Sequence, residues 1–266
     1  IFGAKTDDCI TSIMTELKYL DVFGQRSTLR SFSKERHVSD SDLEAIISAA
    51  SHAPTTGNMQ LYSVVVTRDA DMKRRLAPLH FNQPTVEGCD VLLTVCADFN
   101  RFERWCECRD AVPGYRNFHS FVTALIDAVI FTQQFVTLAE LNGIGSCYLG
   151  TATYSASGIS EILGLPDRVV PVATLAVGYP ADGYPAPSDR LPASAIIHRE
   201  RYHEYTDSDI DAAFGDKEAL ADSLRFVAEN GKSTLAQVFT DVRYPRELNE
   251  AISRTFYEHI SEKGFV

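Results

Sequence analysis

The alternation of apolar and polar residues predicts several helices along the chain. Residues 39–51 carry acidic side chains in the first turn after an N-cap serine, Ser39 or Ser41, which is typical of a helix start. From residue 118 to 141 apolar side chains recur mostly at three- and four-residue steps, so a long, largely buried helix is expected, ended by Asn142-Gly143. Further helices are expected over residues 8–20, 208–230 and 246–261.

Short runs rich in β-branched residues predict strands at 61–67 (LYSVVVT), 90–97 (DVLLTVCA) and 169–178 (VVPVATLAVG). Pro171 places the third run near a sheet edge or at a strand start. Helices and strands alternate without a regular βαβ rhythm, so we expect an α+β fold built as a single domain over residues 1–266. The polar helices from about residue 200 to 266 are expected to form a C-terminal extension, because their apolar faces are too thin to fold alone.

Composition narrows the class of protein. The chain has 266 residues, of which 45% are hydrophobic, and a formal charge of −11. A chain of this size buries a core without metal or disulfide support. Its acidic balance argues against nucleic acid and anionic membranes as partners. The most apolar stretch, residues 121–131, is too short to cross a bilayer and contains Asp127, so no membrane span is predicted.

Cysteine and histidine patterns indicate no metal site. The six cysteines show no CxxC pair, and Cys106-Glu107-Cys108 is too tight for an ordinary zinc site. No HExxH or G-x-S-x-G motif is present, so hydrolytic chemistry is poorly supported. We expect reduced thiols and a cytoplasmic location. The first residues lack a signal-peptide pattern, and the chain begins at Ile1 rather than Met, which leaves open what precedes it.

Separate segments carry candidate binding chemistry. In residues 26–32 (RSTLRSF) two arginines and neighbouring hydroxyls suit a phosphate, although a solvated loop would have the same composition. Residues 52–60 (HAPTTGNMQ) either line a flat ligand or form a plain turn. Residues 143–150 (GIGSCYLG) follow a helix and lead into a strand, the reverse of a dinucleotide fingerprint. Arg190-Leu191-Pro192 adds a later arginine.

The order of these segments resembles the FMN-dependent nitroreductase family, in particular its oxygen-insensitive nitroreductase and NADPH–flavin oxidoreductase branch. CADFNR at residues 96–101 and LGLPDRVVPVATLAVGYPAD at 163–182 are also similar to that branch. The resemblance covers nearly the whole chain. It implies a mixed sheet flanked by helices and an intertwined homodimer with two FMN sites at the interface, in which the C-terminal extension packs on the partner subunit.

The resemblance also implies which residues bind FMN. Its phosphate would be held by Arg26, Ser27, Thr28, Arg30 and Arg190. Its ring would be contacted by Thr55, Thr56, Gly57, Asn58, Gln83, Tyr148, Leu149, Gly150 and Thr151. No side chain is assigned as a catalytic acid or base, because the flavin carries the chemistry. Arg254, in a Ser-Arg-Thr-Phe run, resembles an arginine that the family places beside the substrate.

The implied reaction is hydride transfer from NADPH or NADH through FMN to small planar oxidants such as nitroaromatics, quinones or free flavin, by a ping-pong mechanism. The chain departs from the branch at Ser27 and Ser188, where basic residues are usual, and Asp189 adds a negative charge. Weaker FMN retention is therefore predicted. In residues 230–236 (NGKSTLA) only Lys232 is basic, so it is the candidate for the NADPH 2′-phosphate, and the donor preference stays open.

Two alternatives stay open from the sequence. One is a flavin-binding or flavin-delivering protein with little turnover on the same fold, which a weakened phosphate site would suit. The other is a different reaction on the same scaffold, such as reductive dehalogenation or flavin destruction, for which no additional lid residues are identified. The physiological electron acceptor is not determined by these motifs, since such pockets accept many planar oxidants.

Overall fold

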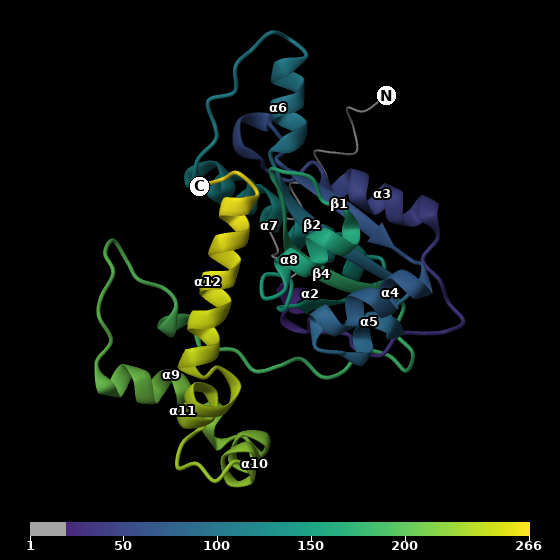
Figure 1. Ribbon diagram of the computed structural model, residues 1–266. Helices are drawn as coiled ribbons and strands as arrows, with labels where there is room; N and C mark the ends of the chain where they lie inside the picture. Colours follow the sequence, from purple (N-terminus) through teal and green to yellow (C-terminus); the bar gives the residue numbers. More distant parts are fainter. Residues whose placement is uncertain (1–19) are drawn as a thin grey trace, which may run out of the picture. The chain divides into compact units, whose positions relative to one another are not determined.

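The computed structural model describes residues 20–266, which form two compact units (Figure 1). The first unit comprises the residues up to Ala186 together with Arg254–Val266, and the second comprises Pro187–Ser253. The second unit thus begins earlier than the extension expected from about residue 200, and the last residues of the chain return to the first unit. The helix expected over residues 8–20 lies outside the described residues apart from Leu20, where α2 (Leu20–Gly24) begins.

An antiparallel sheet is the centre of the first unit, with the strand order β1-β2-β4-β3. Its strands are β1 (Tyr62–Thr67), β2 (Val91–Asp98), β3 (Gly145–Leu149) and β4 (Val169–Gly178). The predicted strand runs are confirmed to within a residue at each end. The expected α+β class is confirmed as well. The resemblance implied a mixed sheet, whereas every pairing among the described strands is antiparallel.

Pro171 lies in β4, which is an inner strand, rather than in an edge strand. It is the third residue of β4, and β3 pairs only with the later residues 174–178. Among the described residues, Pro171 therefore has a sheet neighbour only on the side of β2. The register between β2 and β4 shifts there, between Val95 and Cys96. The missing N–H of proline is tolerated at such a position.

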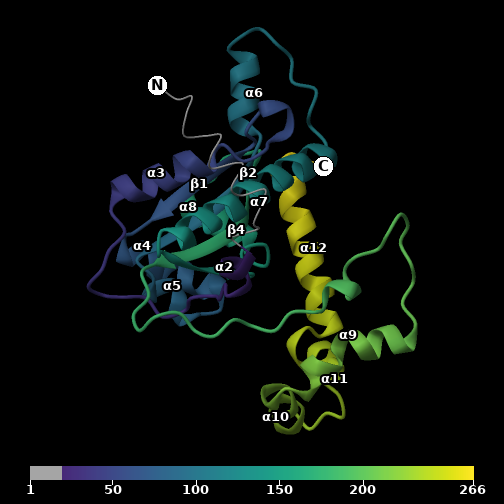
Figure 2. The same ribbon diagram turned by 180° about the vertical axis from the view of Figure 1, so that it is seen from behind.

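Helices cover both faces of the sheet (Figures 1 and 2). On one face α3 (Asp40–Ala50) and α7 (Phe118–Leu141) enclose the main core, in which Phe131 and Leu93 are each 1% exposed. On the other face α4 (Ala70–Leu76), α5 (Pro84–Gly88) and α8 (Ala156–Leu163) pack around Leu92. Leu92 and Leu93, which are neighbours in β2, thus pack into the cores on opposite faces of the sheet, because side chains alternate along a strand.

Local sequence explains where the predicted helices begin and end. Ser39 caps α3 by accepting a hydrogen bond from the backbone N–H of Asp42 at 3.0 Å. Asn117 begins α7 with a capping box, and Gly143 follows its end with a φ of 74°. The helices α4, α5, α6 (Asn100–Glu107) and α8 were not predicted, because helices of 5 to 8 residues show too few turns for an apolar period.

The α7 helix corrects one expectation about the apolar stretch at residues 121–131. That stretch lies in a helix of 24 residues, which by length and composition alone is long and apolar enough to cross a membrane. Its contacts are those of a core helix, because it packs on α3 and on the sheet. Its Asp127 is 1% exposed and bonded to the loop before β1. Burial in the protein thus accounts for the apolar residues on the side of α7 that faces the core.

The second unit is helical where it has regular structure. Its elements are η3 (Ala193–Ala195), α9 (Asp207–Ala219), α10 (Ala221–Glu229), α11 (Leu235–Gln237), the π-helical η4 (Val238–Arg243) and the first half of α12 (Arg246–Glu262). The helix expected over residues 208–230 is broken at Leu220, whose ψ of 139° is extended. The terminal helix expected over residues 246–261 is confirmed to within a residue.

Candidate functional site

Two of the sequence segments with candidate chemistry lie side by side in the first unit. Residues 26–30 run along the outer side of β3, where the backbone N–H of Leu29 donates to the carbonyl of Ser146 at 3.0 Å. Gly145 makes this approach possible, because a Cβ at that position would overlap the side chain of Leu29. The structure therefore brings the arginine-rich segment against the glycine-rich one.

Arg26 and Arg30 make this corner of the first unit basic. The Arg26 guanidinium is bound at two points by Glu140, in the last turn of α7, with Nε–Oε2 and Nη2–Oε1 distances of 3.2 and 3.1 Å. Arg30 is exposed and has no carboxylate partner in residues 20–266. Burial raises the pKa of the nearby Cys147 thiol, and both guanidinium groups oppose that rise. One of the two positive charges is thus already offset by the protein.

Ser27 lies between these arginines and carries a hydroxyl without a partner. The residue is 5% exposed, and its Oγ has no hydrogen-bond partner in the part of the chain that the structure describes. Thr28, which follows, is half-buried. A buried hydroxyl is rarely left unpaired in a native protein, so this one is available to a ligand that comes to the arginines. Two guanidinium groups and hydroxyls are a donor set that suits a phosphate monoester.

His80 connects the loop at Gln83 to the end of β3. The His80 side chain is 0% exposed, and its Nδ1 lies 2.7 Å from the Thr151 hydroxyl. Burial lowers the pKa of this imidazole to about 4, so it is neutral at physiological pH. Gln83 is half-buried and donates its backbone N–H to the His80 carbonyl at 3.1 Å. No sequence motif indicated His80, because its role depends on a contact across 71 residues.

The end of β3 and the turn that follows it present an aromatic ring and open backbone to the surface. Tyr148 is 39% exposed, and burial of its hydroxyl end raises its pKa to about 12. A Cβ placed on Gly150 would meet no atom within 4 Å, so the backbone is open there. Leu149 and Thr151 are buried and anchor the turn on either side of the glycine. An open stretch of backbone amides beside a ring is suited to a flat polar ligand.

The remaining segment, residues 55–58, lies at the opposite corner of the sheet. It precedes β1, the edge strand farthest from β3, and its Thr56 is bonded to Asp127 of α7. Tyr62 of β1 aligns through Ala97 with Val170 of β4, whereas Ser146 of β3 aligns with Val177 at the other end of β4. Three strand spacings, or about 14 Å, separate the two edges across the sheet. One chain therefore does not bring all the predicted ring and phosphate residues to one place.

The other predicted residues have these contacts. Arg190, in the second unit, donates from Nη1 to the carbonyls of Ser188 and Asp189. The Asp189 carboxylate, expected to add negative charge, is paired with Lys217 at 3.2 Å. Lys232 is paired with Asp241 at 2.9 Å. Arg254 lies on the exposed side of α12.

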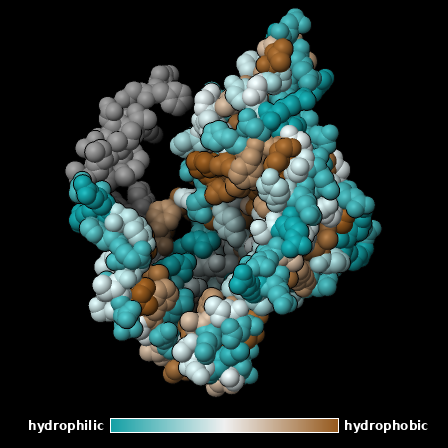
Figure 3. Space-filling view, turned by 60° about the vertical axis from the view of Figure 1, so that its left-hand side comes forward, coloured by the Kyte–Doolittle hydropathy of each residue, from teal (hydrophilic) through white to brown (hydrophobic). Residues whose placement is uncertain are grey.

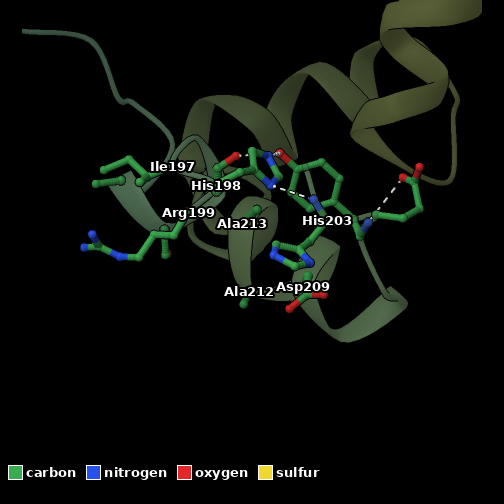
Figure 4. Close-up of a pocket in the computed structure, with 12 residues that line it drawn as sticks. Ile197, His198, Arg199, His203, Asp209, Ala212 and Ala213 are labelled. Atoms are coloured by element: carbon green, nitrogen blue, oxygen red, sulfur yellow. Dashed lines mark hydrogen bonds between the residues drawn. The ribbon is translucent and has the colours of Figure 1, made fainter. Parts of the chain in front are cut away.

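A cavity of about 580 Å³ lies wholly in the second unit (Figure 4). Its central side chain is His198, whose Nε2 lies 3.2 Å from the Tyr205 hydroxyl and whose Nδ1 accepts from the His203 backbone N–H. Figure 4 shows the side chain of Arg199 extending away from His198. Both ring nitrogens of His198 are thus engaged by the protein, and none of the predicted flavin residues lines this cavity.

Apolar side chains also reach the surface of the first unit. Figure 3 shows that brown, apolar residues gather on one face of the molecule. On α7 the exposed apolar residues Ile126, Val129 and Ile130 have exposures of 50%, 48% and 37% and are spaced as one side of a helix. An apolar helix face of this kind is typical of a surface that another protein covers.

Comparisons with known proteins find similar sequences and similar solved structures. The model of the "Nitroreductase family" matches residues 24–179. The FMN reductase (NADPH) of Bacillus subtilis (strain 168) is 32% identical over 68% of this chain and 72% of its own. The oxygen-insensitive NADPH nitroreductase of Salmonella typhimurium is 33% identical over 67% and 72%. A solved structure from Bacteroides fragilis NCTC 9343 has a TM-score of 0.91 and 46% identity, covering 93% of this chain and 100% of that one.

Proposed function

The chain belongs to the nitroreductase family, and on that premise we propose that it is an FMN-dependent oxidoreductase that uses NADPH or NADH to reduce nitroaromatics, quinones or free flavin. The observation that carries the proposal is the convergence of residues 26–30, the Gln83 loop and the turn after β3 around one edge of the sheet. These segments are far apart in the sequence, and they bring two arginines close to the Ser27 hydroxyl, which has no partner among residues 20–266.

The residues at this edge fit the parts of FMN. Arg26, Arg30, Ser27 and Thr28 would hold the phosphate, with Ser27 supplying the buried hydroxyl that has no partner in the described chain. The ring would lie on the backbone from Tyr148 to Thr151, and Gln83 would meet its polar edge. We also propose Arg190 as a phosphate ligand and Arg254 as a residue beside the substrate.

We propose that the active form is a homodimer with the flavin between the two chains. The support is the placement of residues 55–58 at the corner of the sheet opposite to Arg30, which a second copy of the chain would supply to the same flavin. The exposed apolar face of α7 offers a surface for this contact. Thr55, Thr56, Gly57 and Asn58 would then line the ring from the partner.

The protein's own contribution is to bind and orient the reactants. When bound, FMN supplies the redox chemistry, taking a hydride from NAD(P)H and passing electrons to the oxidant. Backbone N–H groups and the Gln83 amide would stabilise negative charge at the polar edge of the ring. The neutral His80 holds Thr151 without adding a charge there. No acid or base side chain is required, since water can deliver the proton.

Lys232 is the candidate for the 2′-phosphate of NADPH. We also propose a cytoplasmic location, where thiols such as the free cysteines among the described residues stay reduced.

Anaerobic titration with each pyridine nucleotide tests the proposed function. The purified chain loaded with FMN is titrated with NADH or NADPH, and the yellow absorbance of the oxidised flavin is followed. We expect bleaching by at least one donor and its recovery on adding a nitroaromatic or quinone, with ping-pong kinetics in the steady state. A flavin that neither donor bleaches would end the proposal.

A second candidate function, flavin binding or delivery with little turnover, has one observation in its favour. Glu140 offsets the charge of Arg26, so the phosphate would be held by fewer net charges than the two arginines suggest. Free FMN that leaves the protein during reduction would favour this candidate. Sustained turnover with FMN retained on the protein would favour the oxidoreductase.

A further inference from the structure

The loop before β1 is held in a backbone conformation that its residues rarely adopt. Gly57, Asn58 and Gln60 have φ values of 55°, 56° and 54°, all in the left-handed region. This region is open to glycine, but for other residues it costs on the order of 1 kcal/mol or more. A shape with two such residues persists only where surrounding contacts impose it, and such strained segments cluster at functional sites.

Asp127 supplies the contacts on one side of this loop. Its carboxylate is buried in α7 and accepts hydrogen bonds from the Thr55 hydroxyl, from the Thr56 hydroxyl and backbone N–H at 2.9 Å each, and from the Leu61 N–H at 3.2 Å. All of these donors belong to the loop or to the residue that follows it. A buried carboxylate whose hydrogen bonds all go to one segment fixes that segment on the helix.

Arg101 supplies the contacts on the other side. It lies in α6, in the CADFNR segment, and its Nη2 donates to the carbonyls of Gln60 and of Tyr62, the latter at 3.0 Å. Its Nη1 reaches the Ser63 hydroxyl at 3.4 Å. The guanidinium thus holds the carbonyl of a strained residue, Gln60, at the point where the loop enters β1. Both anchors are charged side chains that come from elements outside the loop.

We propose that Asp127 and Arg101 are positioning residues, which pre-form the loop over residues 55–60 in the shape that receives the flavin ring. This inference rests on the proposed function, since it assigns the loop its ligand. The protein holds the loop in this shape before any ligand arrives, so the free energy of binding is not reduced by the cost of ordering the loop. Removing an anchor should therefore weaken flavin binding, although neither anchor is assigned a contact with the flavin.

The test compares Asp127→Asn with a matched variant, Glu103→Gln. Glu103 is also a buried acid of the first unit, 4% exposed, but it pairs with Arg168 and not with the loop. Dissociation constants for FMN and for riboflavin are measured by flavin fluorescence, and hydrogen exchange of the flavin-free protein is followed at residues 55–61. Visible circular dichroism of the bound flavin reports the ring environment.

We expect Asp127→Asn to raise both dissociation constants by about tenfold, because the asparagine amide replaces one acceptor oxygen by a donor. The affinity for riboflavin should fall as much as the affinity for FMN, since the loop is assigned to the ring and not to the phosphate. Loop exchange should become faster and the visible circular dichroism should change. Glu103→Gln should lower the unfolding midpoint and leave flavin binding unchanged. Arg101→Met, which removes the other anchor, should act in the same direction as Asp127→Asn and can replace it if that variant does not fold.

The outcomes separate this inference from the proposed function. Wild-type chain that binds neither FMN nor riboflavin would overturn the function, and with it the role of the loop. Wild-type binding that persists unchanged in Asp127→Asn and Arg101→Met, while loop exchange accelerates, would overturn the positioning role alone. An equal loss of flavin in Glu103→Gln would show a general effect of destabilisation and would also overturn it.

Discussion

Asp127 and Glu140 stand thirteen residues apart on α7, and each holds one of the two candidate flavin segments. At 1.5 Å per residue the separation is about 20 Å along the helix axis. Asp127 binds the loop before β1, and Glu140 binds Arg26 beside β3. A single helix thus keeps the two segments of one chain apart, which is why the proposed site needs a second chain.

This separation predicts that dimerisation and flavin binding fail together. Ile126→Asp on the exposed face of α7 should raise the dimer dissociation constant by about tenfold or more, because it places a charge in an apolar contact. Analytical ultracentrifugation at several concentrations measures the change, with FMN affinity determined in parallel. Val112→Asp is the control, since Val112 is 94% exposed and lies outside α7. A monomeric Ile126→Asp protein that kept full FMN affinity would contradict the composite site.

The two arginines should contribute unequally to FMN binding. Arg26 shares its charge with Glu140, whereas Arg30 has no carboxylate partner in residues 20–266. The double variant Arg26→Gln with Glu140→Gln keeps the net charge and should change FMN affinity by less than about threefold. Arg30→Gln should weaken it by about tenfold or more, as expected for one charge-assisted phosphate contact. Fluorescence titration measures both, and riboflavin, which lacks the phosphate, should bind to all three proteins alike. A larger loss of FMN affinity in the double variant than in Arg30→Gln would mean that Arg26, and not Arg30, is the stronger phosphate ligand.

The Lys232–Asp241 pair should set the donor preference. Asp241 occupies the lysine at 2.9 Å, and this pairing lowers the pKa of the Asp241 carboxyl. Asp241→Asn should therefore free Lys232 and lower the KM for NADPH by a few-fold while leaving that for NADH unchanged. Lys232→Ala should raise the KM for NADPH and leave the KM for NADH unchanged. Steady-state kinetics with both donors checks this, and equal effects on NADH and NADPH in either variant would remove Lys232 from the 2′-phosphate site.

His80 should make the protein less stable as the pH falls. Its pKa is lowered by burial from 6.5 to about 4, so between these values the unfolded chain binds more protons than the folded one. Above about pH 6.5 His80 therefore does not reduce the free energy of unfolding. As the pH falls towards 4, that free energy decreases by about 3 kcal/mol. Urea unfolding across this range should show the loss, and His80→Gln should remove most of that slope. Burial also lowers the pKa of His259, so part of the slope should remain. Identical slopes in both proteins would contradict the prediction.

Arg168 should be one of the most sensitive positions for stability. It is 4% exposed, pairs with Glu103 at 2.8 Å, donates to the carbonyl of Gly264 at 2.7 Å and lies 4.1 Å from the ring centre of Phe265. Arg168→Met leaves Glu103 buried without its partner and should lower the free energy of unfolding by about 3–5 kcal/mol. Urea denaturation measures it. Adding Glu103→Leu should recover part of the loss, and no recovery would mean that the backbone contacts dominate.

The periodic elements of the fold were predictable from the sequence. The helix over residues 118–141 and the strand over 169–178 have the predicted bounds, because apolar periodicity over many residues directly encodes burial. The arginines and hydroxyls of residues 26–30 were also recognisable, since residue chemistry is local. The short helices and the break at Leu220 were not, because a few residues carry no measurable period.

Contacts between distant residues were decided only by the tertiary structure. The two-point pair of Arg26 with Glu140 spans 114 residues, and no local pattern indicated that the charge of this arginine is offset. His80 and Asp127 were likewise not assigned any role by motif, since each acts through partners that are distant in sequence. Residue types determine which ligand chemistry the chain can offer. Long-range packing determines which charges remain available and which segments can meet, because electrostatic and hydrogen-bond energies depend on distances that a sequence does not contain.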